Sequence, residues 1–528
     1  MKESYSIFKK KLMLPKETVF FVERKKLYDI FDDNEESVFV ISGRAGMGKK
    51  NAVAQYCRKK EDEVLWYTFD KSDNEESVFL KHFIYGVSMI DKQAEENVKD
   101  FLAAPMKLSK DVIKCFINTL LEMAEHKKSN DKKLYIVLDG LQHIVNQNIL
   151  NMVKMLLENL SGEVKVFILT SASMQGCFSR YMVEGNYRKI TEKELCFSQE
   201  EIQKLAEKYF EKKQVKKGFI QKIEELTGCW PVAVGCLFQS MVEREEELSK
   251  VMKLNKKNLL METVMYDYMY YEIYEKFSQQ EQNFLIKTAV LQELDVAICN
   301  SCLKREDAGK LLRDFWKNHV LELFWENERE YFKYFELFRL FLLEQGERSQ
   351  QKAMEENAGI FYQHRHQYEK AIFYAKGDVK RMSNLLEQCG KKMLQENRLD
   401  LIEKCIQVLK QQEHEFSVLE LEIAAEYFYR SGNKEQMERY LNCADSMFGK
   451  ENKYGMFRSL YRALFHYEED PDKYEKQINN VLFFLEENKI PYPYLGENEQ
   501  ELLNKVIKEK SIEIQENNTC KICNFVRS

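Results

Sequence analysis

The chain has 528 residues, a net charge of −6 and 44% hydrophobic residues, so it is too long for one core and is expected to form several soluble domains. Its 6 prolines and 20 glycines predict a mostly helical protein. The acidic balance excludes an overall basic surface for nucleic acid, and the run Lys9–Lys11 is interpreted as solvated surface. No apolar stretch could cross a bilayer or serve as a signal core, so we expect a cytoplasmic protein without membrane contact.

The 13 cysteines are scattered, mainly in apolar stretches, as expected of reduced thiols. Two Cys-x-x-Cys pairs occur, Cys299/Cys302 and Cys520/Cys523, and they are too far apart to form a four-cysteine zinc motif by spacing. The first pair is expected in a helical core. The second lies in a polar tail, where a weak metal or redox role is the alternative to no function.

The first half of the chain alternates predicted strands and helices. Residues 1–30 form a lead-in, and a helix begins within Phe21–Leu27. A long helix is predicted near 110–126, and β-rich apolar runs predict strands at Val38–Ser42, Val64–Asp70, Leu134–Asp139, Val164–Thr170 and Glu194–Phe197. This alternation predicts an α/β domain with a parallel sheet over residues 31–214.

A glycine-rich stretch follows the first strand and matches the phosphate-binding loop of P-loop proteins up to its last position. Glycines let successive N–H groups point at phosphate oxygens, the following helix adds its positive end, and Lys49 would reach the outer phosphates as a point charge. Lys50 stands where a Ser or Thr hydroxyl normally helps to hold Mg²⁺. The candidate nucleotide-binding residues are Gly43, Arg44, Ala45, Gly46, Met47, Gly48, Lys49, Lys50 and Asn51.

Asp139 ends an apolar strand of the kind that is buried on both faces of a parallel sheet. Such sheets bind ligands at the carboxyl ends of their strands, where Gly43–Lys49, Asp139 and Thr170 are all expected. Asp139 is therefore the candidate Mg²⁺ ligand and the candidate catalytic carboxylate. The alternative is a carboxylate that only caps a neighbouring turn.

The second half contains no convincing parallel strand. Ser198-x-x-Glu201 predicts a helix start by a capping box. Residues 215–265 are expected to form a small helical domain, and residues 266–346 a winged helix with a hairpin that pairs Leu321–Trp325 with Glu330–Tyr334. Helix pairs separated by short polar breaks predict a TPR-like repeat domain over 347–490, followed by a polar tail over 491–528.

Six motifs in a fixed order give the chain a family resemblance. They are Gly43–Lys49, Trp66-Tyr67-x-x-Asp70-x-x-Asp73-Asn74, Ile136–Asp139 followed by His143, Leu195-x-Phe197-Ser198-x-Glu200-Glu201, Thr227-Gly228-x-Trp230-Pro231 and Tyr334–Arg339. Over residues 12–445 the chain resembles the STAND class of signal-transduction P-loop ATPases. More narrowly, it is similar to the MalT-like group of large ATP-binding LuxR-family transcriptional regulators.

The resemblance implies an ATP- or ADP-binding domain, a winged helix and a helical sensor array. It also implies a small-molecule effector, nucleotide-dependent self-association, and packing of Pro231 on the adenine. The family's C-terminal helix-turn-helix has no matching segment after residue 490, so direct DNA binding is not expected and an unidentified protein partner is expected instead.

Four positions depart from the family pattern. Lys50 replaces the metal-binding hydroxyl, Gly140 stands where a second carboxylate activates water, Ser171 replaces a phosphate-sensing arginine, and Phe335 replaces a histidine that contacts the diphosphate. The loss of groups that stabilise phosphoryl transfer predicts at most a weak ATPase.

Three hypotheses remain open at this stage. The first is a nucleotide-binding signalling switch that acts through protein contacts. The second is a nucleotide-free interaction scaffold, in which the phosphate loop is only a tight turn and a vestigial ATPase fold supports the helical repeats. The third is an active ATPase.

Overall fold

The computed structural model describes residues 7–17, 21–32, 36–60, 63–91, 109–128, 133–160, 164–172, 187–210, 215–245, 248–326, 328–448, 458–460, 462–464, 466–467, 470–487 and 504. The chain divides into two compact units. The first unit comprises Met1–Asn300 and Lys304–Glu347, and the second comprises Ser301–Leu303 and Arg348–Ser528. Cys520 and Cys523 lie outside the described residues.

The centre of the first unit is a parallel sheet with the strand order β2-β3-β4-β1-β5. Its register places Ser42 opposite Thr170 and Asp139 opposite both Leu169 and Thr68, so these residues share the carboxyl edge. The prediction that this edge gathers the phosphate loop, Asp139 and Thr170 is confirmed. The strands are β1 (Val38–Ser42), β2 (Glu63–Thr68), β3 (Leu134–Asp139), β4 (Val164–Thr170) and β5 (Arg188–Ile190).

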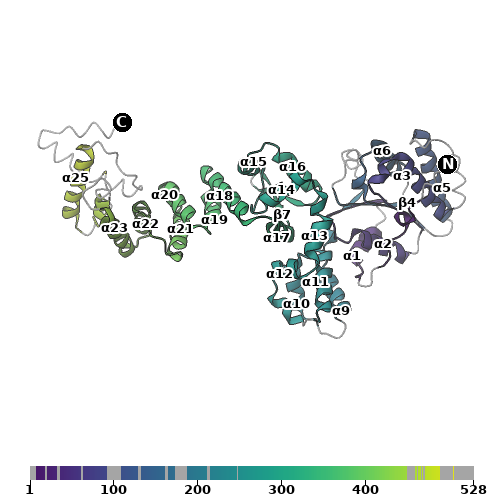
Figure 1. The fold of residues 1–528 in the computed structure, drawn as a ribbon, viewed down its shortest axis with the longest axis horizontal. Helices are drawn as coiled ribbons and strands as arrows, with labels where there is room; N and C mark the ends of the chain where they lie inside the picture. Colours follow the sequence, from purple (N-terminus) through teal and green to yellow (C-terminus); the bar gives the residue numbers. More distant parts are fainter. Residues whose placement is uncertain are drawn as a thin grey trace. The chain divides into compact units, whose positions relative to one another are not determined.

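The sheet has a separate apolar layer on each face, because successive side chains of a strand point to opposite sides. Val38, Val40 and alternate residues of β3 and β4 join the core formed with α3 (Glu76–Ile90), α5 (Lys110–Lys128) and α6 (Gln147–Asn159). The helices α1 (Lys25–Asp32) and α2 (Lys49–Lys60) lie beside the sheet (Figure 1), and on the other face aromatic rings from α1, α2, β1 and β4 pack at centroid distances of 5.1–5.9 Å. These rings belong to Phe31, Phe39, Tyr56 and Phe167.

The predicted strand Glu194–Phe197 is wrong. Residues Glu192–Leu195 form the short helix α8, and the edge strand β5 lies just before it, paired in parallel with β1. The reason is local, since Thr191 and Glu194 form a capping box that starts a helix. The capping box of Ser198 and Glu201, which begins α9 (Gln199–Tyr209), is confirmed.

Over the described residues that follow α9, the first unit consists of helices and their connecting loops apart from one hairpin. Its strands β6 (Leu321–Glu326) and β7 (Arg329–Tyr334) pair Leu321 with Tyr334 and Trp325 with Glu330, which is the register that the sequence predicts. Cys299 and Cys302 are buried in α15, as expected. The helices are α10 (Lys217–Thr227), α11 (Pro231–Glu243), α12 (Lys256–Glu262), α13 (Met265–Glu272), α14 (Gln279–Thr288), α15 (Val296–Leu303), α16 (Ala308–Lys317) and α17 (Glu336–Gln345).

The second unit is built from consecutive helices, and several of the described breaks fall on polar stretches that the sequence predicts, whereas the break at residues 412–417 was not predicted. Lys376–Asp378, for example, separates α19 from α20, and Ser431–Asn433 separates α22 from α23. The helices are α18 (Arg348–His364), α19 (Tyr368–Ala375), α20 (Val379–Gln395), α21 (Leu399–Gln411), α22 (Val418–Arg430), α23 (Lys434–Phe448) and α25 (Pro471–Glu487) (Figure 1).

Lys11 corrects the interpretation of the basic run at the N-terminus. Lys9 and Lys10 are exposed, but Lys11 is buried at the end of a short 3₁₀ helix. Its ammonium group lies 2.8 Å from the carboxylate of Asp73, which is fully buried and also accepts a hydrogen bond from the hydroxyl of Tyr67. The lead-in is thereby anchored to the sheet domain by a buried ion pair.

We expect Lys11→Met to reduce the free energy of unfolding by about 3 kcal/mol, because it leaves the buried carboxylate of Asp73 without its counter-charge. Lys10→Met is the matched control, since Lys10 is exposed and its substitution removes the same charge. Thermal unfolding of the two variants tests this. Equal melting temperatures would show that the buried pair does not hold the lead-in in place.

Candidate functional site: the phosphate loop and its neighbours

The phosphate loop, residues Gly43–Asn51, follows β1 and includes the first turn of α2. The carbonyl groups of its first four residues accept hydrogen bonds from other groups of the protein. The ammonium of Lys49 donates to the carbonyls of Gly43 and Arg44, the indole N–H of Trp230 donates to that of Ala45 at 3.1 Å, and the N–H of Val232 donates to that of Gly46 at 3.1 Å. In a trans peptide unit the N–H points away from the carbonyl. The amides that follow Ala45 and Gly46 are therefore turned away from Trp230 and Val232.

Two glycines make this path possible. Gly46 and Gly48 both have a φ of 76°, a left-handed conformation that other L-residues rarely adopt. The helix α2 begins directly after them at Lys49, so the first N–H groups of the helix have no intrahelical acceptor. This end of the helix, with its positive partial charge, has the local structure of an anion-binding site.

Lys49 lies almost completely inside this structure. Burial lowers the pKa of its ammonium group to about 8, while the carboxylates of Glu192 and Asp139 act in the opposite direction. An anion at the loop would supply the counter-charge that the buried ammonium group lacks.

Lys50 occupies the place at which a metal ligand was expected. Its Nζ atom lies 2.7 Å from Oδ2 of Asp139, and the hydroxyl of Thr68 lies 3.4 Å from the same oxygen. Asp139, the candidate Mg²⁺ ligand and catalytic carboxylate, is therefore paired with an ammonium group. Across the described ranges, no group of three or more His, Cys, Asp or Glu side chains is arranged to hold a metal ion.

The backbone conformation at position 140 requires a glycine. Its φ is 86°, and a Cβ atom added to it would lie 3.0 Å from the carbonyl oxygen of Phe69. A second carboxylate at this position would be strained and crowded. The departure from the family pattern at Gly140 thus has a steric cause.

Glu192, at the start of α8, binds Arg44 of the phosphate loop. Its carboxylate accepts a hydrogen bond of 2.7 Å from the N–H of Arg44 and another of 2.7 Å from Nε of the same residue. A Cβ atom at Gly43 would meet Cγ of Glu192 at 2.9 Å, so the glycine permits this close approach. Arg44 is therefore held by α8 and does not extend into solvent.

The first residues of α11 pack against the phosphate loop. Pro231 is the first residue of this helix, where a missing N–H costs nothing. A Cβ atom at Gly48 would lie 3.9 Å from Cβ of Pro231, and one at Gly46 would lie 2.4 Å from Cγ1 of Val232. Pro231 therefore lies beside the phosphate loop, which is the other part of the predicted nucleotide-binding site.

The winged-helix region contacts the same loop. Glu322 of β6 lies 3.0 Å from Arg44, and the ring of Phe335, just before α17, lies 4.2 Å from the Arg44 guanidinium. His319 follows α16 and places Nε2 2.8 Å from the hydroxyl of Ser42 at the end of β1. Burial lowers the pKa of His319 to about 4, so its imidazole is neutral at physiological pH.

The sequence analysis did not identify Arg24, Glu192 and His319 as neighbours of the phosphate loop. Arg24 is buried beside the loop, where it donates to Glu201 at 2.8 Å, and a Cβ atom at Gly48 would lie 3.9 Å from its Nη1 atom. These residues reach the loop from distant segments, so no local spacing identifies them. Ser171, in contrast, was singled out and lies at the sheet edge, where its N–H donates to Gln142.

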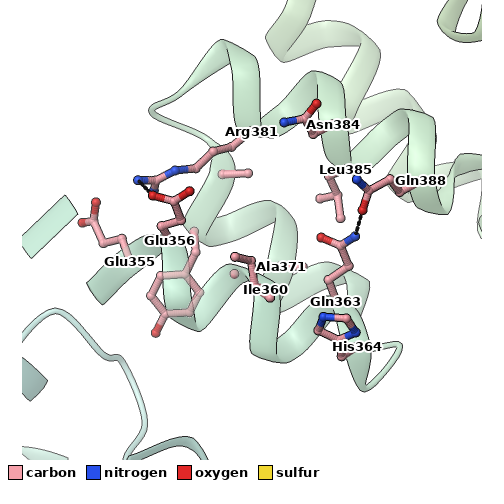
Figure 2. A pocket seen from close by; sticks show the side chains of 13 residues that line it. Glu355, Glu356, Ile360, Gln363, His364, Ala371, Arg381, Asn384, Leu385 and Gln388 are labelled. Atoms are coloured by element: carbon pink, nitrogen blue, oxygen red, sulfur yellow. Dashed lines mark hydrogen bonds and ion pairs between the residues drawn. The ribbon is translucent and has the colours of Figure 1, made fainter. Parts of the chain in front are cut away.

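The second unit contains a separate concave surface, which we name the repeat groove. It lies between α18 and α20, with a cavity of about 280 Å³ (Figure 2). Arg381 faces Glu356 at one end, and Gln363 donates to Gln388 at the other, across a floor that includes Ile360 and Leu385. Charged groups, amide groups and apolar side chains together suit a ligand with polar and apolar parts.

We expect Gly46→Ala to destabilise the first unit more than Gly228→Ala does. Both glycines have positive φ, but only at Gly46 does the added methyl group meet other side chains, so the difference measures the contacts with Val232 and with the hydroxyl of Tyr268. Overpacking of this kind costs about 1–3 kcal/mol. Chemical denaturation of the two variants supplies the comparison, and equal losses would mean that neither α11 nor α13 packs closely against the loop.

Comparisons with known proteins agree with this architecture. Residues 270–354 match the family model of the MalT winged helix domain, and residues 19–171 match that of Nephrocystin 3, N-terminal. A curated relative, the HTH-type transcriptional regulator MalT of Vibrio cholerae, is 21% identical over 374 residues. The match covers 69% of this chain and 40% of the relative, so the chain spans less than half of the relative's length.

Among solved structures, the Walker-type ATPase of Pyrococcus abyssi matches with a TM-score of 0.43 and 13% identity, over 61% of this chain and 94% of that chain. No described helix has the length and hydropathy needed to cross a membrane. With its parallel sheet, its phosphate loop and its MalT winged helix domain, the chain is a MalT-like protein with a P-loop ATPase fold.

Proposed function

We propose that this protein is a nucleotide-binding regulator, in which ADP or ATP at residues 43–51 controls the contact between the phosphate loop and the winged helix. One observation carries the proposal: Arg44 of the loop contacts Glu192 of the sheet domain and also Glu322 and Phe335 of the winged-helix region. A ligand that attracts Arg44 or Lys49 would change both sets of contacts. We take the sheet, small helical and winged-helix regions as domains at 31–214, 215–265 and 266–346.

The contacts that would be switched are of moderate strength. The Arg44–Glu322 pair is half exposed on the carboxylate side and contributes at most about 1 kcal/mol, and the stacking of Arg44 on Phe335 adds about 1 kcal/mol. A ligand that binds one arrangement ten times more tightly shifts the equilibrium by about 1.4 kcal/mol. To offset both contacts, about 2 kcal/mol together, the nucleotide must therefore prefer one arrangement by about thirtyfold.

The same geometry favours binding over turnover. The proposed phosphate grip consists of the helix N-terminus and Lys49, whose ammonium group donates to the carbonyls of Gly43 and Arg44 in this structure and would turn to the phosphate on binding. Hydrolysis additionally needs groups that orient water and neutralise charge in the transition state. Lys50 and Gly140 stand where these groups would be, so ATP hydrolysis is not part of the proposal.

The output of the switch is proposed to be a contact with another protein or with a second copy of this chain. The repeat groove, which the proposed repeat domain 347–490 contains, offers a surface for a partner or a small effector. Light scattering in ADP and in ATP would report nucleotide-dependent self-association. The groove also supports a second candidate function, that of a nucleotide-free scaffold whose helical repeats bind a partner whatever occupies the phosphate loop.

Binding of a fluorescent ADP analogue to Lys49→Ala and Lys59→Ala distinguishes these two functions. Lys59 lies on the same helix but is exposed and paired with Glu23, so its loss controls for net charge. We expect Lys49→Ala to weaken binding by at least about tenfold, because a charge-assisted bond to phosphate contributes about 1.5–3 kcal/mol. If the wild-type chain binds neither ADP nor ATP, the scaffold function replaces the switch.

The affinity for ADP should also fall as the pH rises from 7 to 9. The pKa of Lys49 is lowered to about 8 in the free protein, so the ammonium form predominates at pH 7 and is depleted by about tenfold at pH 9. Binding at the higher pH must therefore take up a proton, and titrations in buffers of different ionisation enthalpy measure this uptake. Lys49→Arg should flatten the profile, because arginine stays protonated throughout this range.

A further inference from the structure

We propose that the nucleotide binds without a divalent cation and that the ammonium group of Lys50 occupies the position that such a cation would need. This inference rests on the proposed function, because it assumes that ADP or ATP binds at the phosphate loop. It goes further by stating which form of the nucleotide the site accepts, namely the metal-free form.

The position of Lys50 follows from the start of α2. It is the second residue of this helix, directly after Lys49, so its side chain leaves the chain at the mouth of the loop. From there its Nζ atom reaches Oδ2 of Asp139 at 2.7 Å, a normal distance for a charge-assisted hydrogen bond. The side chain of Asp139 is 14% exposed, so the carboxylate is largely screened from water.

The remaining groups do not fit Mg²⁺. This ion takes oxygen ligands at 2.0–2.1 Å in an octahedron and is usually held by one or two carboxylates and the phosphates. Here Asp139 is already bonded to a cation, position 140 has no side chain, and position 50 provides no hydroxyl. A divalent ion near Asp139 would be repelled by the ammonium group of Lys50.

The ammonium group can replace part of what the ion does. It carries three donors, of which one bonds to Asp139, and the others are available to phosphate oxygens beside the loop. Lys49 and Lys50 together bring two positive charges to the helix end, where a diphosphate would bring negative ones. An ammonium group cannot draw two phosphate oxygens into a common coordination sphere as Mg²⁺ does, so this arrangement retains charge neutralisation for binding.

The test is the affinity of the full chain for a fluorescent ADP analogue in excess EDTA and in millimolar Mg²⁺. We expect binding in EDTA to be at least as tight as in Mg²⁺, because Mg²⁺ in solution competes with the protein for the diphosphate. An increase in affinity of about tenfold or more on addition of Mg²⁺ would overturn the inference. Absence of binding under both conditions would instead overturn the proposed function.

Three variants test whether metal-free binding depends on the ammonium group of Lys50. Lys50→Thr restores the hydroxyl of the usual motif, and we expect it to lose about tenfold in affinity in EDTA and to recover that loss in Mg²⁺. Lys50→Arg, which keeps the charge, should stay independent of Mg²⁺. Lys59→Met on the same helix should match the wild type in both conditions. Thermal unfolding confirms that each variant is folded, and a Lys50→Thr variant that binds like the wild type in EDTA would exclude the proposed role of Lys50.

Discussion

The hydrogen bonds that hold the carbonyl groups of the phosphate loop are the constraint on which this site depends. Trp230 and Val232 bond the carbonyls of Ala45 and Gly46, and Lys49 bonds those before them. Because each peptide unit is rigid, these bonds also set the direction of the neighbouring amides. The anion-binding geometry is thus built by the small helical region around α11 as much as by the glycine motif itself.

Arg44 joins this geometry to the winged helix. Its guanidinium group is shared between Glu192, Glu322 and the ring of Phe335, so the loop cannot change its charge environment without affecting the hairpin β6–β7 and the start of α17. If nucleotide binds as proposed, this sharing offers a route from phosphate binding to the domain contact that does not need hydrolysis. Coupling of this kind requires only that the ligand prefers one of the two arrangements.

The parts of the fold that the sequence predicts are those determined locally. The strand–loop–helix around Val38–Asn51, the hairpin register and the helix breaks at Lys376–Asp378 and Ser431–Asn433 follow from periodicity, glycine positions and turn residues. The error at Glu194–Phe197 arose because a short apolar run outweighed a capping box that was present in the sequence. The burial of Lys11 and the arrival of Glu192 and His319 at the loop depend on tertiary contacts, which no local pattern encodes.

The left-handed backbone at Gly140 has a consequence for how this site can change over evolutionary time. A single substitution there cannot install a catalytic carboxylate, because the new side chain would press against the carbonyl of Phe69 in an unfavourable conformation. Catalysis through a magnesium ion at Asp139 would also need the Lys50–Asp139 ion pair to open. Each change alone supplies only part of what phosphoryl transfer needs, so a descendant of this chain would have to acquire both together to use the usual magnesium-dependent chemistry.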